Sequence, residues 1–253
     1  MQSVYEVAMR SIPGTRAQQQ DYAFYQAGPD RVFAVVCDGM GGMDEGFTAS
    51  AVATEKIKEQ YCCKNPAESY SSFFMRSVEI IDECVYSLKN TQGERLNAGT
   101  TIVAAVIEDD RLYWLSVGDS RLYLLRENEI VQVTRDHNYF LSLNQLAQEN
   151  RIDRREYEYE AARGEALISY IGMGGVQIAD INEIPFRLMH GDTVLLTSDG
   201  LSKALPDWEI LRILSGSDVA SALDSLIDRS VEYSAAFQDN TTCIAIRFCE
   251  EQS

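Results

Sequence analysis

The chain contains no run of about 18 consecutive apolar residues, the length from which a membrane-spanning helix is inferred. Residues 1–30 also lack a basic segment followed by an apolar one, which is the pattern of a secretory signal. These two absences argue against membrane insertion and against export. We therefore expect a cytoplasmic protein.

Basic residues are scarce relative to acidic ones. The chain has 22 Lys and Arg against 39 Asp and Glu, which gives a formal net charge of −17. Such a balance disfavours binding to nucleic acid or to an anionic membrane surface. It is compatible with a site that concentrates divalent cations, although most of these acids must form a solvated surface.

The cysteine pattern indicates neither a set of disulfides nor a cysteine-based metal site. The chain has no CxxC pair among its six cysteines, Cys37, Cys62, Cys63, Cys84, Cys243 and Cys249. Most have apolar sequence neighbours, so we expect small buried thiols in a reducing compartment.

Several signatures of nucleophilic and phosphate-loop chemistry are also missing. No cysteine is followed six positions later by arginine, so the Cys-x5-Arg loop of tyrosine phosphatases is absent. No Asp-x-Asp pair occurs, which removes the usual aspartyl-phosphate signature. Neither a Walker loop nor a GxGxxG motif is present.

What the chain does contain is an alternation of strand runs and helix pairs. Its 253 residues suffice for one large domain or two small ones, and without repeats or low-complexity linkers we expect a single domain over 1–253. Periodicity and turn residues predict strands at 4–12, 21–26, 31–37, 98–107, 111–117, 121–125, 178–187, 193–197 and 241–248. Helices are predicted at 45–62, at 65 to about 90 with Asn65 as the N-cap, at 206–214 and at 218–233.

This order predicts an α+β fold. Strands joined by short turns pair antiparallel, and two helix pairs cover the faces of two sheets, which gives a four-layer sandwich. The segment 134–175 is polar and has only weak helical periodicity. We interpret it as an irregular excursion from the sheet.

Asp38 is the most informative single residue. It ends the apolar run 32–37, and a glycine cluster beginning with Gly39 follows. A tight Asp-Gly turn explains this pattern without any function. A carboxylate presented at the rim of a sheet explains it equally well.

The same pattern recurs at four other aspartates. Each lies where a predicted strand begins or ends: Asp21, Asp119, Asp199 and Asp239. Carboxylate and carbonyl oxygens suit hard cations such as Mg²⁺ or Mn²⁺. Spacing alone leaves open whether the five converge.

An ordered set of motifs decides how the pattern is interpreted. From residue 14 to residue 242 the chain contains GTR (14–16), QD (20–21), VCDGMGG (36–42), GTT (99–101), VGDSR (117–121), DH (136–137), GD (191–192), TSDGL (197–201) and DNTT (239–242). In this order the motifs resemble the metal-dependent protein serine/threonine phosphatases of type 2C, the PPM family, in their compact bacterial form.

The resemblance implies a β-sandwich with a helix pair on each side, and a role for each site residue. Asp38 would bridge two Mg²⁺ or Mn²⁺ ions, and the Gly39 carbonyl would bind one of them. Asp199 and Asp239 would complete the other ion's site, while Asp21 would act through bound water. Asp119, together with Asp199, would match a third and weaker metal site. Arg16 would bind the substrate phosphate.

The resemblance also implies how the protein is used. Segment 134–175 would be the family's variable flap, and its arginines at 151, 154, 155 and 163 are candidates for contacts with acidic substrates. We expect phosphorylated protein substrates, a cognate Ser/Thr kinase as partner, and a monomer. The alternative is a catalytically silent module that binds a phosphoprotein.

The chain departs from the family pattern at Gln19, Gln20, Met40 and Met43, and two of these positions bear on the chemistry. Met40 stands where many eukaryotic relatives have a histidine, so no imidazole can protonate the leaving group from there, and water is the expected acid. Gln20 replaces a glutamate, which puts direct coordination at that position in doubt. For His137 the motif leaves a structural role and a substrate-adjacent role open.

Overall fold

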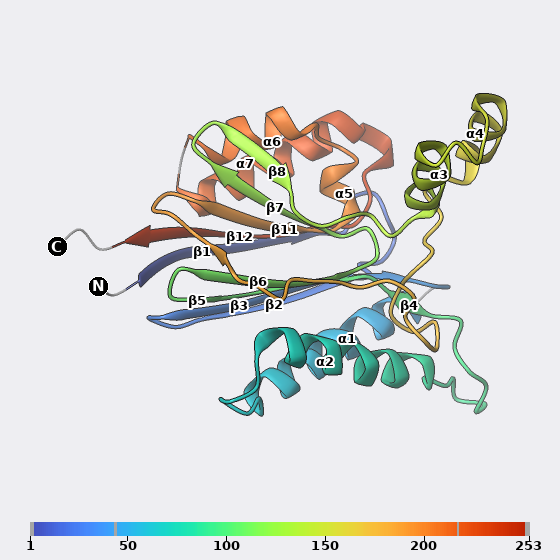
Figure 1. Ribbon diagram of the computed structural model, residues 1–253, viewed down its shortest axis with the longest axis horizontal. Helices are drawn as coiled ribbons and strands as arrows, with labels where there is room; N and C mark the ends of the chain where they lie inside the picture. Colours follow the sequence, from blue (N-terminus) through green and yellow to red (C-terminus); the bar gives the residue numbers. More distant parts are fainter. Residues whose placement is uncertain (1–2, 43–44, 217, 251–253) are drawn as a thin grey trace.

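The computed structural model describes residues 3–42, 45–216 and 218–250 of the chain. Two antiparallel sheets lie face to face, and helices cover both outer faces (Figure 1). The α+β four-layer sandwich expected from the sequence is therefore confirmed. Among the described residues, no helix is both long and apolar enough to cross a membrane.

The first sheet has five strands, and it joins the two ends of the described chain. Its order is β1 (Ser3–Ile12), β12 (Thr241–Glu250), β11 (Thr193–Thr197), β7 (Arg121–Arg126) and β8 (Glu129–Gln132). The second sheet has the order β10 (Phe186–Arg187), β6 (Arg111–Val117), β5 (Ile102–Glu108), β3 (Arg31–Met40) and β2 (Asp21–Ala27). Two short strands extend it: β4 (Gly99–Thr100) pairs with β3, and β9 (Asp180–Ile181) pairs with β6.

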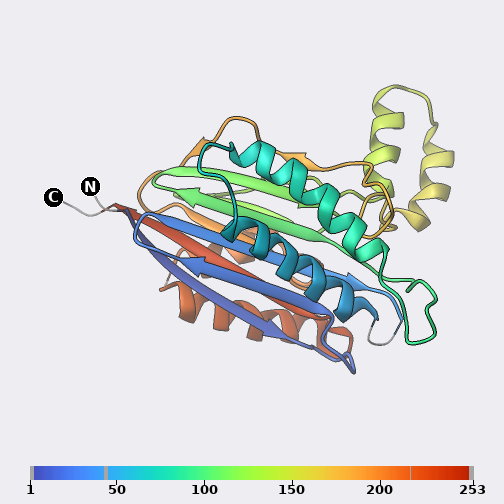
Figure 2. The ribbon, with the colours of Figure 1, turned by 90° about the horizontal axis from the view of Figure 1, so that it is seen from below.

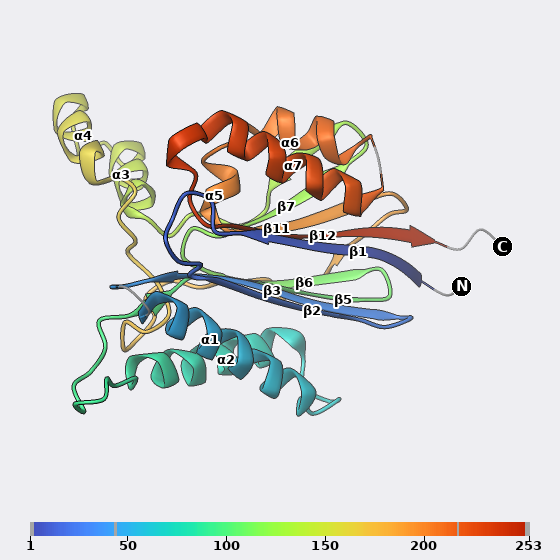
Figure 3. The same ribbon diagram turned by 180° about the vertical axis from the view of Figure 1, so that it is seen from behind.

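Helices form the two outer layers. Helices α1 (Glu45–Cys62) and α2 (Tyr70–Tyr86) lie side by side across the second sheet (Figure 2). The first sheet is covered by α5 (Asp199–Ser202), α6 (Asp207–Leu214) and α7 (Val219–Ser234), with α7 over β1 and β12 (Figure 3). Helices α3 (Tyr139–Gln148) and α4 (Arg154–Glu160) project beyond one end of the sandwich (Figure 1).

Strand β3 is apolar from Val32 to Cys37 because both of its faces are buried there. Phe33, Val35 and Cys37 point into the core beneath α1 and α2. Their neighbours Val32, Ala34 and Val36 point into the core between the sheets. Successive side chains of a strand point to opposite faces, so a strand in the second layer of four needs apolar residues at every position.

The predicted start of the second helix is wrong. Asn65 forms a local turn in which its Oδ1 accepts a hydrogen bond from the Ala67 N–H at 3.0 Å. The helix begins at Tyr70, and Ser69 is its N-cap, with Oγ accepting from the Ser72 N–H at 3.1 Å. Asparagine side chains favour such turns as readily as helix caps, so the sequence signal was ambiguous.

The continuous strand predicted at 178–187 is also wrong. Only β9 and β10 form there, and Asn182 lies between them. Its side chain accepts from the Trp114 N–H at 2.8 Å and donates to the Leu112 carbonyl at 3.1 Å. A side-chain amide thus takes the place of the backbone ladder along β6.

Three further corrections concern elements that lack an apolar signature. Strand β8 and the helical turn α5 were not expected, and segment 134–175 contains the helices α3 and α4. A capping box between Asp153 and Glu156 starts α4, none of whose side chains is buried, so it shows no apolar stripe.

Cys37 and Cys243 are buried as expected, but Cys62 and Cys63 are exposed, because they follow Ile57, the last buried residue of α1.

Candidate active site

Strand register brings the five predicted aspartates to one end of the sandwich. Asp21 is directly opposite Asp38 in the β2–β3 pair. Asp119 follows the end of β6, Asp199 follows β11, and Asp239 precedes β12. These strand ends coincide because β11 and β12 are antiparallel neighbours, as are β3 and β5, and β5 and β6.

The backbone at Asp38 is fixed by the neighbouring β4 segment. Its N–H donates to Thr101 Oγ1 at 3.0 Å, and its carbonyl accepts from the Thr101 N–H at 2.9 Å and from Thr100 Oγ1 at 2.9 Å. These hydrogen bonds fix the backbone that carries the Asp38 carboxylate. The paired threonines also explain the GTT motif at 99–101.

Residue 39 must be glycine because α1 starts against it. A Cβ at Gly39 would lie 2.1 Å from the carbonyl oxygen of Gly46 and 2.6 Å from that of Gln20. The Gly39 N–H donates to the same Gln20 carbonyl at 3.1 Å. Gln20 therefore supports the site through its backbone oxygen, whatever its side chain does.

Asp21 joins the two sheets. It is 3% exposed, and its Oδ2 accepts a hydrogen bond from Ser198 Oγ at 2.8 Å, across the interface between the sheets. Its Oδ1 is buried and has no hydrogen-bond partner among the residues that the structure describes. Burial raises the pKa of Asp21 to about 6, and the charge of Asp199 adds to this effect although the Ser198 hydroxyl opposes it.

Asp38 is the most perturbed carboxyl of the group. Loss of hydration raises its pKa well above the ordinary value, and the charges of Asp21, Asp199 and Asp119 raise it further. Carboxylates held this close repel one another unless protons or cations intervene. The cluster therefore favours positive charge at this position.

A cavity of about 450 Å³ opens beside these carboxyls. Its lining includes five of the residues singled out from the sequence: Arg16, Asp38, Gly39, Asp199 and Asp239. Asp21 and Asp119 are not among the described residues that line it. Met40 and Gly41 also line the cavity, so an apolar side chain occupies the rim next to Asp38.

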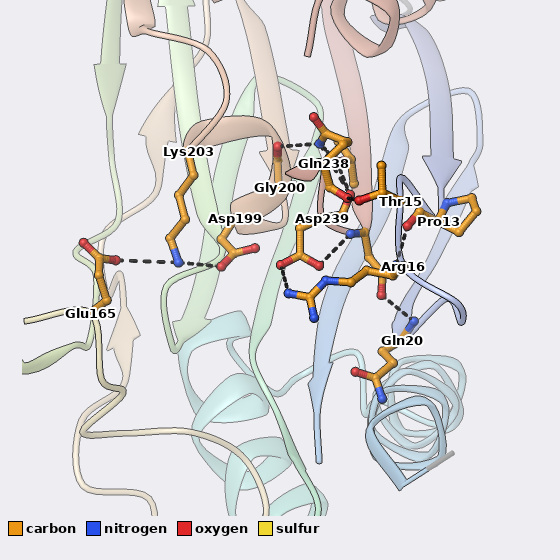
Figure 4. A network of polar contacts seen from close by, with 12 residues as sticks. Pro13, Thr15, Arg16, Gln20, Glu165, Asp199, Gly200, Lys203, Gln238 and Asp239 are labelled. Carbon is orange, nitrogen blue, oxygen red and sulfur yellow. Dashed lines mark hydrogen bonds and ion pairs between the residues drawn. The ribbon is translucent and has the colours of Figure 1, made fainter. Parts of the chain in front are cut away.

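Arg16 projects into this cavity from the loop after β1. Its Nη2 lies 2.7 Å from Asp239 Oδ2 (Figure 4). The pair is open to solvent, with 63% of the Arg16 side chain exposed, so it contributes little to stability. Within the described part of the chain, Asp239 is the partner of one guanidinium nitrogen, and the other N–H donors can meet an anion that enters the cavity.

Asn240 holds the Arg16 loop in place, a role that the sequence analysis missed. Its Nδ2 donates to the carbonyls of Pro13 at 2.8 Å and Gln18 at 2.9 Å, and its Oδ1 accepts from the Gln20 N–H at 2.8 Å. These bonds tie residues 13–20 to the start of β12. The asparagine in the DNTT motif was the available signal.

The third-site aspartate has different surroundings. Asp119 is 7% exposed, and burial together with the charge of Asp199 raises its pKa to about 6. The Lys203 ammonium lies beside it, with Nζ 3.7 Å from Asp119 Oδ2. The same Nζ is 2.6 Å from Asp199 Oδ2 (Figure 4). Neither Lys203 nor its third partner, Glu165, was singled out from the sequence.

His137 lies beneath the turn that presents Asp119. Its buried ring accepts a hydrogen bond at Nδ1 from the Gly118 N–H at 3.1 Å, so the proton of the neutral ring is on Nε2. That nitrogen lies 3.5 Å from Asp180 Oδ1. The structural role is thus favoured for His137, and Gly118 itself adopts a φ of 106° that suits glycine.

Comparison with known proteins gives the family. The sequence model of the family described as Protein phosphatase 2C matches residues 14–238. The chain belongs to this family. The resemblance drawn from the motifs is thereby confirmed, and so is the expected class of enzyme, a protein serine/threonine phosphatase.

Individual relatives agree with this membership. The chain is 27% identical over 216 residues to the serine/threonine phosphatase stp of Listeria monocytogenes, covering 84% of this chain and 82% of that protein. It is 27% identical over 243 residues to the protein phosphatase PhpP of Streptococcus pneumoniae, covering 94% and 95%.

Solved structures show the same fold. The Streptococcus agalactiae serine/threonine phosphatase superposes with a TM-score of 0.83 at 22% identity, covering 98% of this chain and all of that one. The catalytic domain of the phosphatase PstP, solved in complex with two manganese ions, gives a TM-score of 0.77 at 26% identity, with 98% and 100% coverage.

The family's metals can be tested against the residues present. Within residues 3–42, 45–216 and 218–250, no three acidic, cysteine or histidine side chains are grouped ready to hold an ion. Figure 4 shows that side-chain cations already contact two of the carboxylates, because Arg16 pairs with Asp239 and Lys203 pairs with Asp199. The oxygen donors, the unpartnered Asp21 Oδ1 and the raised carboxyl pKa values all fit hard cations at Asp38, Asp199 and Asp239.

Proposed function

We propose that this protein hydrolyses phosphoserine and phosphothreonine in phosphoproteins at a centre of two Mg²⁺ or Mn²⁺ ions. The observation that carries the proposal is the cavity in which Asp38, Asp199 and Asp239 lie together with Arg16. Membership of the family supports it, and so does the likeness to the PstP catalytic domain, which was solved with two manganese ions.

Each residue has a role that its geometry permits. Asp38 offers two oxygens from a fixed backbone, so it can bridge two ions, with the Gly39 carbonyl beside it. Asp199 and Asp239 would hold the second ion. Asp21, buried behind Asp38, would act through water. When bound, two such ions neutralise the phosphoryl oxygens and make a water acidic enough to attack at neutral pH.

Arg16 would receive the substrate phosphate. A guanidinium is a planar fork that matches phosphate oxygens, and the ion pair with Asp239 aims it into the cavity. Met40 cannot donate a proton, so the leaving alkoxide would take its proton from an ordered water. Phosphate transfer of this kind needs mainly positioning and charge, which these residues supply.

The arginines of segment 134–175 support contacts with acidic substrates less than the sequence suggests. Three of the four arginines singled out there form ion pairs with acids of the same segment: Arg151 with Glu149, Arg154 with Glu158 and Arg163 with Glu160. Local neutralisation leaves little positive charge for an acidic substrate. A cognate kinase, a cytoplasmic location and a monomeric state stay predictions.

The decisive experiment measures turnover of p-nitrophenyl phosphate and of a phosphothreonine peptide with Mn²⁺, then with EDTA. We expect turnover of both substrates with Mn²⁺ and none with EDTA. A silent phosphoprotein-binding module would bind the peptide without metal-dependent release of phosphate. That result would overturn the proposal.

A further inference from the structure

Lys203 occupies the place between Asp119 and Asp199. It directly follows α5, and its N–H donates to the Asp199 carbonyl at 2.8 Å. This helical spacing of four residues returns the side chain over the Asp199 carboxylate, with Nζ 2.6 Å from Oδ2. The same ammonium lies 3.7 Å from Asp119 Oδ2 and 3.6 Å from Glu165 Oε2.

Three carboxylates lie close to this ammonium. They belong to Asp199, Asp119 and Glu165, whose nearest oxygens are 2.6, 3.7 and 3.6 Å from Nζ. The side chains alone of Asp119 and Asp199 are 9% and 18% exposed, so solvent screens their attraction to the ammonium only partly. The pair therefore has a permanent counter-cation.

We propose that Lys203 is a built-in cation that replaces the third metal ion, so that this phosphatase works with two ions. The inference rests on the proposed function. A divalent ion held by both Asp119 and Asp199 would have to lie beside the ammonium, and like charges at that distance repel strongly. The third site implied by the resemblance therefore does not fit the residues present.

The arrangement also gives Lys203 a positioning role. It uses Oδ2 of Asp199 and leaves Oδ1 for an ion in the cavity. Through Glu165 it connects the carboxylates to segment 134–175 (Figure 4). A dissociable third ion would make this connection depend on metal concentration, whereas a lysine makes it permanent.

The test counts Mn²⁺ ions bound to the full chain by calorimetry, with free Mn²⁺ followed by electron paramagnetic resonance. We expect the wild type to saturate at two ions, and Lys203→Ala to bind a third ion more weakly than the first two. Lys203→Asn is a second variant in case the alanine variant does not fold. The matched control is Lys56→Ala, which removes another ion-paired lysine, 2.7 Å from Glu59 on α1, and should keep two ions.

The outcomes separate the two proposals. Three ions on the wild type, or two on a folded Lys203 variant, would overturn the lysine inference and leave the two-metal function standing. No ions on any variant would overturn the proposed function and the inference with it. Circular dichroism of each variant establishes that the count is made on folded protein.

Discussion

Among single residues, Asp38 combines the greatest electrostatic cost with the central place in the cavity. Its carboxyl pKa is raised by lost hydration and by three neighbouring aspartates. A carboxylate in such unfavourable surroundings indicates a binding role, since a neutral side chain would suit the metal-free site better. Its contribution to function is therefore separate from its contribution to stability.

We expect Asp38→Asn to lower kcat on p-nitrophenyl phosphate by more than about 100-fold, because an amide cannot bridge two cations. The melting temperature of the metal-free variant should not fall, since a repelled charge is removed. Asp109→Asn, in the exposed turn between β5 and β6, is the matched control. Undiminished turnover in Asp38→Asn would show that the metals bind elsewhere.

Arg16→Ala tests the phosphate contact. Charge-assisted hydrogen bonds are worth about 1.5–3 kcal/mol, so KM should rise roughly 10- to 100-fold with a smaller change in kcat. Arg154→Ala removes another ion-paired arginine, on α4 and still more exposed than Arg16, and should leave KM unchanged. An unaltered KM in Arg16→Ala would assign that side chain to a surface ion pair with Asp239.

Among the elements, β9 is small but anchors segment 134–175 to the second sheet. Burial alone would raise the pKa of Asp180, but the nearby His137 ring and hydrogen bonds from the side chain and backbone of Arg135 outweigh it and lower the pKa below the ordinary 3.8. The carboxylate is thus favoured in the folded protein. Its stabilisation is complete above the unfolded pKa and disappears as pH falls through the lower folded value.

We therefore expect Asp180→Asn to lower the free energy of unfolding at pH 6 by about 2 kcal/mol, the value of charge-assisted hydrogen bonds. Below about pH 4, the free energy of unfolding should fall less steeply with pH in this variant than in the wild type. Urea denaturation across pH 3–7 measures both effects. Asp224→Asn is the control, since the Asp224 carboxylate pairs with Arg10 while 59% exposed. Parallel pH profiles for Asp180→Asn and the wild type would contradict this account.

The elements also show what the sequence can predict. The sequence predicts α1 at 45–62 with its observed bounds, because small and apolar residues repeat at helical spacing over its whole length. It misplaces the start of α2, where Asn65 suited a turn as well as a cap, and it misses α4, which buries nothing. Local pattern predicts elements that pack, and fails where a single side chain decides the outcome.

Across the whole molecule, the site exists only when both sheets are assembled. Asp21 and Asp38 belong to the second sheet, whereas Asp199 and Asp239 flank strands of the first. Motif order indicates these residues, but their distances depend on pairings such as Ser198 with Asp21, 177 positions apart. The sequence does not single out Lys203, because a lysine that follows a motif resembles any surface lysine until its spatial neighbours are known.

This assembly makes metal binding a property of the fold, which the melting temperature can report. An unfolded chain does not hold these carboxylates together, so ions bind the folded state and stabilise it by mass action. With Mn²⁺ at about 100 times its Kd, one site adds about 2.7 kcal/mol, or roughly 5–10 °C for a chain of this size. Calorimetric melting of EDTA-treated protein, with and without Mn²⁺, measures this shift, and Asp38→Asn should abolish most of it. The same shift in Asp38→Asn as in the wild type would mean that Mn²⁺ binds the general acidic surface, to which the −17 charge contributes, and that the cavity contributes nothing.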